Sequence, residues 1–306
     1  MLNRYRLGYA CHNMNLESIT AAHRITLKKL KTLSREEQLA KLRIVLRKNL
    51  EALRNILEFN VVHGIKLYRI PSELVPLATH EITSDWDYFQ EFANEFEEIG
   101  NYIKEHELRV TIHVTQYTFL NSNREEVASQ AVRDIHYHSQ LLDQIGLDQS
   151  GVVVIHVGGV YGNKEAAIDR FIDRFSILKD SAKRRIVIEN DDKSFDILEV
   201  LKIARKVKVP ALFDYHHYRC LDQRGDLKEV LIQVKETWGK KRMKIHYSSP
   251  KSQSNYRSHS EYINSDNFME FINSLKKMGL KDIDIMLECK AKDKALLKLQ
   301  KELKIS

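Results

Sequence analysis

Six short apolar segments of the chain each end in a histidine or an acidic residue. The segments read TIH, VVVIH, RIVIE, LFD, KIH and IMLE, and their last residues are His113, His156, Glu189, Asp214, His246 and Glu288. Imidazole nitrogens and carboxylate oxygens bind divalent cations such as manganese, magnesium and zinc when no thiolate is present. If the six side chains meet, the three carboxylates repel one another unless cations neutralise them. The pattern therefore predicts a cluster of divalent metal ions.

Each of these residues also has an ordinary structural explanation when it is taken alone. A histidine in an apolar strand is usually a core residue with one hydrogen-bond partner. A carboxylate at the end of a strand often caps the following helix. Six such residues on consecutive segments favour the metal cluster over six separate coincidences.

The segments belong to a pattern that repeats along the whole chain. Eight β-branched apolar runs alternate with longer stretches whose apolar residues recur at spacings of three and four, as in amphipathic helices. The runs cover residues 6–11, 65–70, 109–114, 152–157, 185–190, 211–215, 243–247 and 283–289. Near-continuous apolar strands joined by helices indicate a parallel sheet that is buried on both faces. Eight such units predict one (β/α)₈ TIM barrel over residues 1–306, although an open doubly wound sheet without a GxGxxG motif is an alternative.

This fold would place the polar residues at one mouth of the protein. All eight strands of a TIM barrel run in the same direction, and their carboxyl ends carry the active-site loops. The six residues that end strands three to eight would therefore share one rim. Among the remaining histidines, His80 follows strand two on the same rim and stays a candidate ligand.

The composition is compatible with a nucleic-acid partner. The 49 Lys and Arg residues outnumber the 42 Asp and Glu residues, which gives a formal net charge of +7. A basic surplus favours an acidic partner, although solvated lysine faces give the same balance. Three cysteines without CxxC spacing indicate neither a disulfide framework nor a thiolate zinc site. No apolar run approaches about 18 residues, so we expect a cytoplasmic protein without a membrane segment.

At these residues the sequence resembles the ultraviolet-damage endonuclease family. The resemblance runs through nearly the whole chain and is carried by the phrases RLGYACHN, YRIPSELVPLATH, HVTQYTFLNS, VVVIHVGGVYGNKEAAIDRF, RIVIENDD, LFDYHHYRC, KIHYSSP and SHSEYI. It implies a monomeric enzyme, associated with the nucleoid, that nicks damaged double-stranded DNA. The cut would lie immediately 5′ of cyclobutane pyrimidine dimers and 6-4 photoproducts, and would leave 3′-hydroxyl and 5′-phosphate ends. Abasic sites would also be cut.

The resemblance further implies up to three divalent cations, commonly Mn²⁺, with Mg²⁺ and Zn²⁺ as alternatives. His113, His156 and Glu189 would hold the first cation. The second would be held by Glu189, which is shared with the first, together with Asp214, His246 and Glu288. His217 and His259 would hold the third. Abasic-site endonucleases, which are more distant relatives, carry an aspartate two residues before that last histidine, whereas this chain has Arg257. Because a guanidinium cannot ligate a cation, the third site is weaker or is completed by another group.

Lys244 is a candidate for that group. It lies two residues before His246, so both side chains face the same side of the strand. A carbamylated Lys244 would be an anionic ligand, whereas an ordinary ammonium would contact a DNA phosphate. Glu189 and Glu288 could assist proton transfer during phosphodiester hydrolysis.

Recognition of damage is predicted for residues that follow strands one and three. Gln116 and Tyr117 come directly after the third strand, and an amide beside an aromatic ring would suit a wedge that replaces lost base pairing and stacking. Tyr9 and Asn13 match the family on the same rim. Lys164, Lys251 and Arg257 are candidates for phosphate contacts.

Three other functions use similar residues. An abasic-site endonuclease would need the same metals, and incision assays on the two lesions would separate it from a photoproduct nuclease. A sugar-phosphate isomerase or epimerase shares the barrel, but the basic surplus and the Gln116–Tyr117 pair count against it. A non-catalytic damage-binding protein is disfavoured because the whole ligand set is present.

Overall fold

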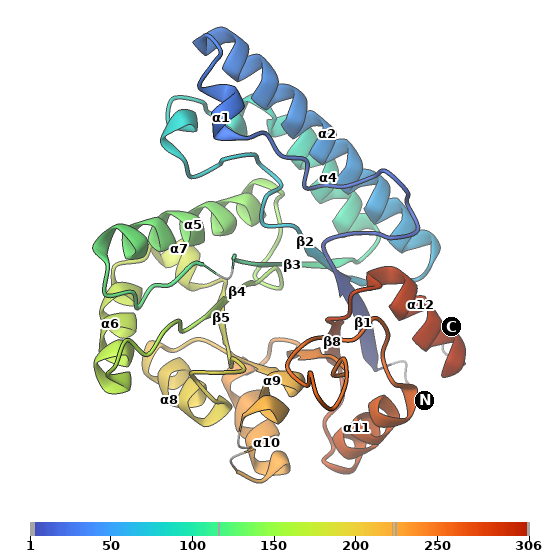
Figure 1. Cartoon of the computed structure of the whole chain (residues 1–306). Helices are drawn as coiled ribbons and strands as arrows, with labels where there is room; N and C mark the ends of the chain where they lie inside the picture. The colour runs from blue at the N-terminus through green and yellow to red at the C-terminus, as the bar shows by residue number, and fades with distance from the viewer. Residues whose placement is uncertain (1–3, 116, 222, 224, 305–306) are drawn as a thin grey trace.

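Eight parallel strands close into a barrel in the order in which they occur along the chain (Figure 1). The computed structural model describes residues 4–115, 117–221, 223 and 225–304. The strands are β1 (Tyr5–Ala10), β2 (Leu67–Ile70), β3 (Arg109–His113), β4 (Val153–His156), β5 (Ile186–Glu189), β6 (Ala211–Asp214), β7 (Lys244–Tyr247) and β8 (Ile283–Leu287). β8 pairs with β1 in parallel, which closes the barrel. The structure confirms the predicted (β/α)₈ fold, and the open sheet is wrong.

Helices surround the strands on the outside of the barrel (Figure 1). The longer ones are α2 (Arg35–Val62), α4 (Ala93–Glu105), α5 (Glu125–Gln144), α6 (Lys164–Ser176), α8 (Ile197–Val207), α10 (Leu227–Trp238), α11 (Ser265–Lys277) and α12 (Lys292–Glu302). The short ones are α1 (Leu27–Leu30), the 3₁₀ helix η1 (Glu81–Thr83), α3 (Tyr88–Glu91), α7 (Asp180–Lys183) and α9 (Tyr215–Cys220). α2 begins with a capping box in which Ser34 and Glu37 each bond the other's backbone N–H. No helix in these described ranges is long and apolar enough to cross a bilayer.

The inside of the barrel holds polar side chains in layers. Residues two apart on a strand point to the same face, so Asp284 and Glu288 on or just after β8 both face the barrel axis. At the amino-terminal end, the Asp284 carboxylate accepts hydrogen bonds from Arg6 Nε at 2.7 Å, Arg109 Nη1 at 2.8 Å and Arg242 Nε at 2.5 Å. This buried ion cluster closes the bottom of the barrel, opposite the mouth that carries the candidate site.

The middle layer separates the two charged ends. Lys244 from β7 donates to Thr111 Oγ1 of β3 at 3.1 Å across the interior. Beside this pair, Leu67, Met286 and Ala10 form a small apolar cluster of their own, apart from the main core between strands and helices. The charged groups at the two ends of the barrel are therefore separated by a layer that contains Lys244, Thr111 and three apolar side chains.

Candidate metal centre

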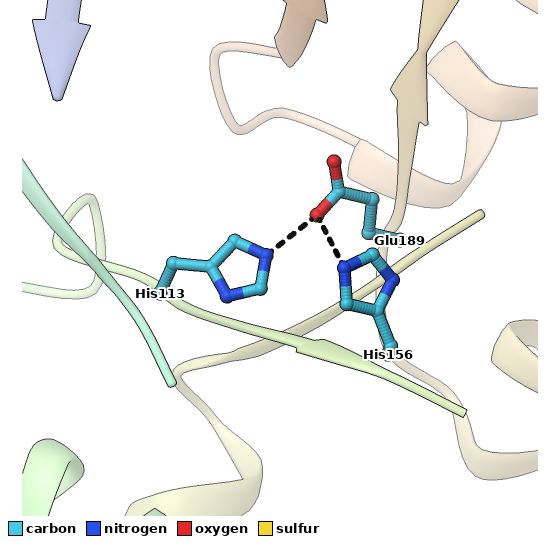
Figure 2. Close-up of side chains that lie close together, drawn as sticks. All are labelled: His113, His156 and Glu189. Carbon is cyan, nitrogen blue, oxygen red and sulfur yellow. Dashed lines mark hydrogen bonds and ion pairs between the residues drawn. The ribbon is translucent and has the colours of Figure 1, made fainter. Parts of the chain in front are cut away.

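Glu189 is the centre of a cluster at the carboxyl ends of the strands. It is the last residue of β5 and is buried. Its Oε2 lies 2.8 Å from His113 Nε2 and 3.5 Å from His156 Nε2; dashed lines in Figure 2 mark both contacts. Its Oε1 lies 2.6 Å from His246 Nδ1. Three strands besides its own thus direct an imidazole at one carboxylate.

Two further carboxylates lie beside this group. His246 Nδ1 is 3.2 Å from Glu288 Oε1 and 3.9 Å from Asp214 Oδ2. His217 Nδ1 lies 3.8 Å from Asp214 Oδ2 and 4.0 Å from Glu189 Oε1. Asp214 also caps α9 by accepting from the His217 backbone N–H at 2.7 Å, so the turn after β6 orients both side chains.

Three sets of ligand atoms are close enough to bind metal ions, since the atoms within each set lie within 4.8 Å of one another. The sets are His113–His156–Glu189, Glu189–Asp214–His217 and Asp214–His246–Glu288. The first set is the one expected from the sequence, and the third consists of three of the four residues expected for the second ion. His217 joins Glu189 and Asp214 in the second set, and its ring centroid lies 6.4 Å from that of His259. His259 Nε2 lies 3.9 Å from Glu288 Oε2, and the third site expected at His217 and His259 stays a prediction.

The chemistry of this cluster fits divalent cations. The buried carboxylates of Glu189 and Asp214 are crowded together with the largely buried Glu288, and Asp214 Oδ2 has no hydrogen-bond partner among the described residues. An unpaired buried carboxylate oxygen is costly, and a cation at that position would satisfy it. All the donors are imidazole nitrogens and carboxylate oxygens, which suits manganese, magnesium or zinc.

The protonation of the histidines supports the same interpretation. Burial lowers the pKa of His156 and of His246 to about 4, so both rings are neutral near pH 7 and keep a lone pair for a metal. Burial also acts against the charged form of His217, but the carboxylates of Asp214, Glu189 and Glu288 outweigh it and raise the pKa of that ring to about 9. The His217 proton therefore provides positive charge at a place where a cation would bind.

Comparison of the sequence with known proteins identifies the family of the chain. The model of the UV-endonuclease UvdE family matches residues 5–306. The chain belongs to this UV-endonuclease family. It is 41% identical over 300 residues to the UV DNA damage endonuclease of Bacillus cereus (strain Q1), covering 97% of this chain and 94% of that protein. The corresponding protein of Bacillus anthracis (strain A0248) is 40% identical over the same length.

Solved structures show the same fold. The crystal structure of SacUVDE superposes with a TM-score of 0.88 at 35% identity and covers 99% of this chain and 100% of that one. Endonuclease IV from Thermus thermophilus superposes with a TM-score of 0.58 at 13% identity, covering 99% of this chain and 100% of that chain. At that identity the second comparison shows only that the barrel is shared.

Arg69 belongs to the cluster and was missed in the sequence. It lies on β2 and its guanidinium forms an ion pair with Glu288 through Nη1 and Oε1, both side chains being largely buried. Burial alone would lower the pKa of Arg69, but Glu288 raises it, so the charge is permanent. Leu67 faces the barrel interior, and Arg69, two residues further on, shares that face. That alternation was the signal available in the sequence for a charged residue on this strand.

Lys244 is fully buried beneath the cluster. Its ammonium donates to Thr111 Oγ1, and no carboxylate lies within 4.0 Å of it among the ion pairs of the described residues. Burial, with Arg69 and Arg109 nearby, lowers the pKa of Lys244 to about 7. Because the side chain has no exposed surface, the structure does not support the alternative in which Lys244 contacts a DNA phosphate.

His80 has a different role from the one considered in the sequence. It is the residue before η1, and its Nδ1 accepts the backbone N–H of Ile82 at 3.1 Å. It belongs to none of the three metal-ligand sets found among the described residues. His80 therefore caps a short helix, and the structure gives it no place as a ligand.

The residues proposed to contact DNA divide into exposed and buried ones. Tyr117 is 73% exposed, whereas Gln116 lies outside the described residues. Tyr9 and Asn13 are buried: Tyr9 donates to Asn60 Oδ1 at 2.8 Å and accepts from Asn13 Nδ2 at 2.9 Å. As these two side chains lie, neither offers a surface to DNA, and they brace the loop after β1 instead.

The three basic candidates for phosphate contacts also differ. Lys164 pairs with Glu199 at 2.8 Å, so its charge is partly neutralised. Lys251 and Arg257 are exposed in the loop after β7, close in sequence to the ligand candidate His259. Contact of these residues with a phosphate backbone stays a prediction.

Proposed function

We propose that this protein is a metal-dependent endonuclease that cuts DNA beside ultraviolet damage. The observation that carries the proposal is the cluster of histidines and carboxylates at one mouth of the barrel, in a chain that belongs to the UV-endonuclease family. The protein's formal charge of +7 suits a DNA substrate. The damaged strand would be nicked immediately 5′ of cyclobutane pyrimidine dimers or 6-4 photoproducts, leaving a 3′-hydroxyl and a 5′-phosphate.

The residues of the cluster would hold up to three cations, with Mn²⁺ proposed first and Mg²⁺ and Zn²⁺ as alternatives. When bound, such cations activate the attacking water and neutralise charge on the phosphate. Glu189 stands between two ligand sets and would keep them at a fixed separation. The neutral rings of His156 and His246 contribute ligand atoms without adding charge. The ion pair with Arg69 keeps Glu288 ionised and oriented toward His246.

We also propose that Lys244 carries a carbamate. The neutral amine would add to carbon dioxide, forming a nitrogen–carbon bond and releasing one proton, so that an anionic group replaces the ammonium. The amine is fully buried and has one hydrogen bond among the described residues, to Thr111; this supports the carbamate, since a buried ammonium without a carboxylate partner is costly. A carbamate would face Arg69 and the cations of the cluster with the opposite charge.

Discrimination of damage is assigned to the loop between β3 and α5. Tyr117 is exposed there, while its neighbour Thr118 is buried, so the ring projects from an anchored backbone. A photoproduct weakens stacking and pairing, which lowers the cost of moving the damaged bases out of the helix. Stacking of Tyr117 in the gap would return about 1–3 kcal/mol.

Incision of defined duplexes tests the proposal. One duplex carries a single cyclobutane dimer, a second carries one abasic site, and a third is intact, each with an end label on the damaged strand. We expect Mn²⁺-dependent cutting 5′ of the dimer and of the abasic site, no cutting of the intact duplex, and loss of all cutting with a chelator. Cutting of the abasic duplex alone would favour an abasic-site endonuclease. Cutting that survives removal of all divalent metal would contradict the proposed site.

A further inference from the structure

The loop that carries Tyr117 is tied to helix α5 by one carboxylate, that of Asp134. We propose that Asp134 is a positioning residue for damage recognition, which acts through Tyr117 and touches neither DNA nor the metal ligands. The inference rests on the proposed function, because it assigns Tyr117 to the contact with damaged bases. In this proposal the contact of Tyr117 with damaged bases depends on Asp134 and on its connection between the loops after β2 and β3.

The Asp134 side chain connects two loops at the mouth of the barrel. Its Oδ1 accepts from Thr79 Oγ1 at 2.6 Å, and Thr79 lies in the loop after β2. Its Oδ2 accepts from Thr118 Oγ1 at 3.4 Å, and Thr118 follows Tyr117 in the loop after β3. Gln130, one turn earlier on α5, donates to Asp134 Oδ1 at 2.7 Å and to Thr79 Oγ1 at 2.8 Å. Both loops are thus fixed to the same point on the helix.

The loop after β2 is itself held firmly against α5, which makes it a rigid support for Asp134. His138 Nε2 lies 3.3 Å from the backbone carbonyl of Ser72, and its Nδ1 lies 2.6 Å from the carbonyl of Asp134. One residue earlier, the hydroxyl of Tyr137 accepts the backbone N–H of Val75 at 3.2 Å. Two contacts from neighbouring residues of the helix, His138 to Ser72 and Tyr137 to Val75, therefore bind this loop before it reaches Thr79.

The far end of the Tyr117 loop is anchored separately. Arg174 donates to the carbonyl of Leu120 at 2.9 Å, and Arg170 donates to the carbonyl of Asn121 at 3.0 Å, both from α6. Asn121 Nδ2 in turn donates to the carbonyl of Gly159 at 2.8 Å. The loop is therefore pinned downstream of Tyr117 by α6 and at Thr118 by Asp134.

The contrast in exposure shows what the anchor at Thr118 achieves. Thr118 is 3% exposed, whereas Tyr117 is 73% exposed. Thr118 Oγ1 also lies 3.2 Å from Thr115 Oγ1, which closes the turn around the exposed ring. Without the Asp134 carboxylate, the backbone that presents Tyr117 loses its fixed point on α5. The ring must then be ordered when DNA binds, which weakens binding to the lesion.

The test is a double-mutant cycle between Asp134 and Tyr117 in the metal-loaded enzyme. The variants are Asp134→Ala, Tyr117→Ala and the double variant, with Asp134→Asn as the conservative change. Asp143→Ala is the matched control, because Asp143 lies on the same helix and pairs with Arg185 at 2.6 Å away from both loops. Each protein is assayed for kcat and KM on a dimer-containing duplex, for inhibition by the intact duplex, and for bound metal.

We expect Asp134→Ala to raise KM for the dimer duplex about tenfold, with kcat, bound metal and inhibition by intact duplex nearly unchanged. Asp134→Asn keeps an acceptor for Thr79 and a polar partner for Thr118, so it should recover most of the loss. The double variant should have the same KM for the dimer duplex as Tyr117→Ala, since both substitutions remove the same interaction, the contact of Tyr117 with the lesion. Asp143→Ala should lower the melting temperature without changing KM.

Three results would overturn the inference. The first is an unchanged KM for the dimer duplex in Asp134→Ala. The second is a double variant in which the KM increases of the two single variants multiply, because Asp134 would then act independently of Tyr117. If Tyr117→Ala itself leaves KM and inhibition unchanged while the enzyme still cuts, the assignment of Tyr117 fails, and the role of Asp134 fails with it. Absence of any dimer cutting by the unmodified enzyme would instead contradict the proposed function.

Discussion

The proton on His217 makes metal binding depend on pH in a way that can be calculated. Asp214, Glu189 and Glu288 raise the pKa of this ring to about 9 against the effect of burial. A cation bound at Glu189, Asp214 and His217 must displace that proton. At about pH 7.5 the displacement costs roughly 2 kcal/mol, because about 1.5 pKa units at about 1.36 kcal/mol each must be overcome. The apparent affinity for Mn²⁺ should therefore rise about eightfold between about pH 7.5 and about pH 8.5.

His156, His246 and Lys244 contribute little to the pH dependence in this range. The pKa values of His156 and His246 are lowered by burial to about 4, so both rings are already neutral. Lys244, with its pKa lowered to about 7, is mostly deprotonated above about pH 7.5 and would add a factor of only about 1.3. The pH dependence in this window is therefore assigned to His217.

Calorimetric titration of the metal-free protein with Mn²⁺ under nitrogen measures this effect. Two buffers with different ionisation enthalpies give the number of protons released, which we expect to approach one for this site. His217→Gln should bind more weakly at about pH 8.5 and should lose the pH dependence. An affinity that does not change with pH in the unmodified protein, or an equal slope in His217→Gln, would refute the assignment.

The raised pKa of His217 should also make the metal-free protein less stable as the pH rises, although its affinity for Mn²⁺ increases. A group whose pKa is higher in the folded state stabilises that state below its unfolded pKa, here 6.5. This contribution is lost as the pH rises through about 9. The chelated protein should thus melt at a lower temperature as the pH increases over this range, while the metal-bound protein should not.

Three further predictions concern other residues of the cluster. Arg69→Met leaves the buried Glu288 carboxylate without its partner and should destabilise the chelated protein by about 3–5 kcal/mol. Addition of Mn²⁺ should recover much of this loss, and equal losses with and without metal in thermal unfolding would contradict this reasoning. Isotopically labelled bicarbonate should give a carbamate carbon signal in the nuclear magnetic resonance spectrum of the native protein that disappears in Lys244→Met, and a spectrum unchanged by that substitution would remove the carbamate. His113→Ala or Glu288→Gln should reduce incision of the dimer duplex about a thousandfold or more while binding to that duplex changes little; normal incision rates would show that neither residue is a ligand.

The barrel and the types of residue at its mouth could be predicted from the sequence. Alternation along a strand and the repeat of strand and helix are local patterns, and they survive folding because every unit of the barrel uses them in the same way. The runs predicted at residues 109–114 and 185–190 are the strands β3 and β5, which end one residue earlier, at His113 and Glu189. Convergence of these ends at one rim follows from the parallel direction of the strands alone.

Which side chains become partners was decided by the tertiary structure. Arg69 meets Glu288 across 219 positions of the chain, and closure of the barrel between β1, β2 and β8 brings them together. The turn after β6 directs His217 toward Asp214 and Glu189, and Tyr9 is buried with its hydroxyl bonded to Asn60 of α2 and to Asn13. A residue's periodicity shows which face of an element it occupies. Its partner, its burial and its charge state depend on elements distant in the sequence that pack against that face.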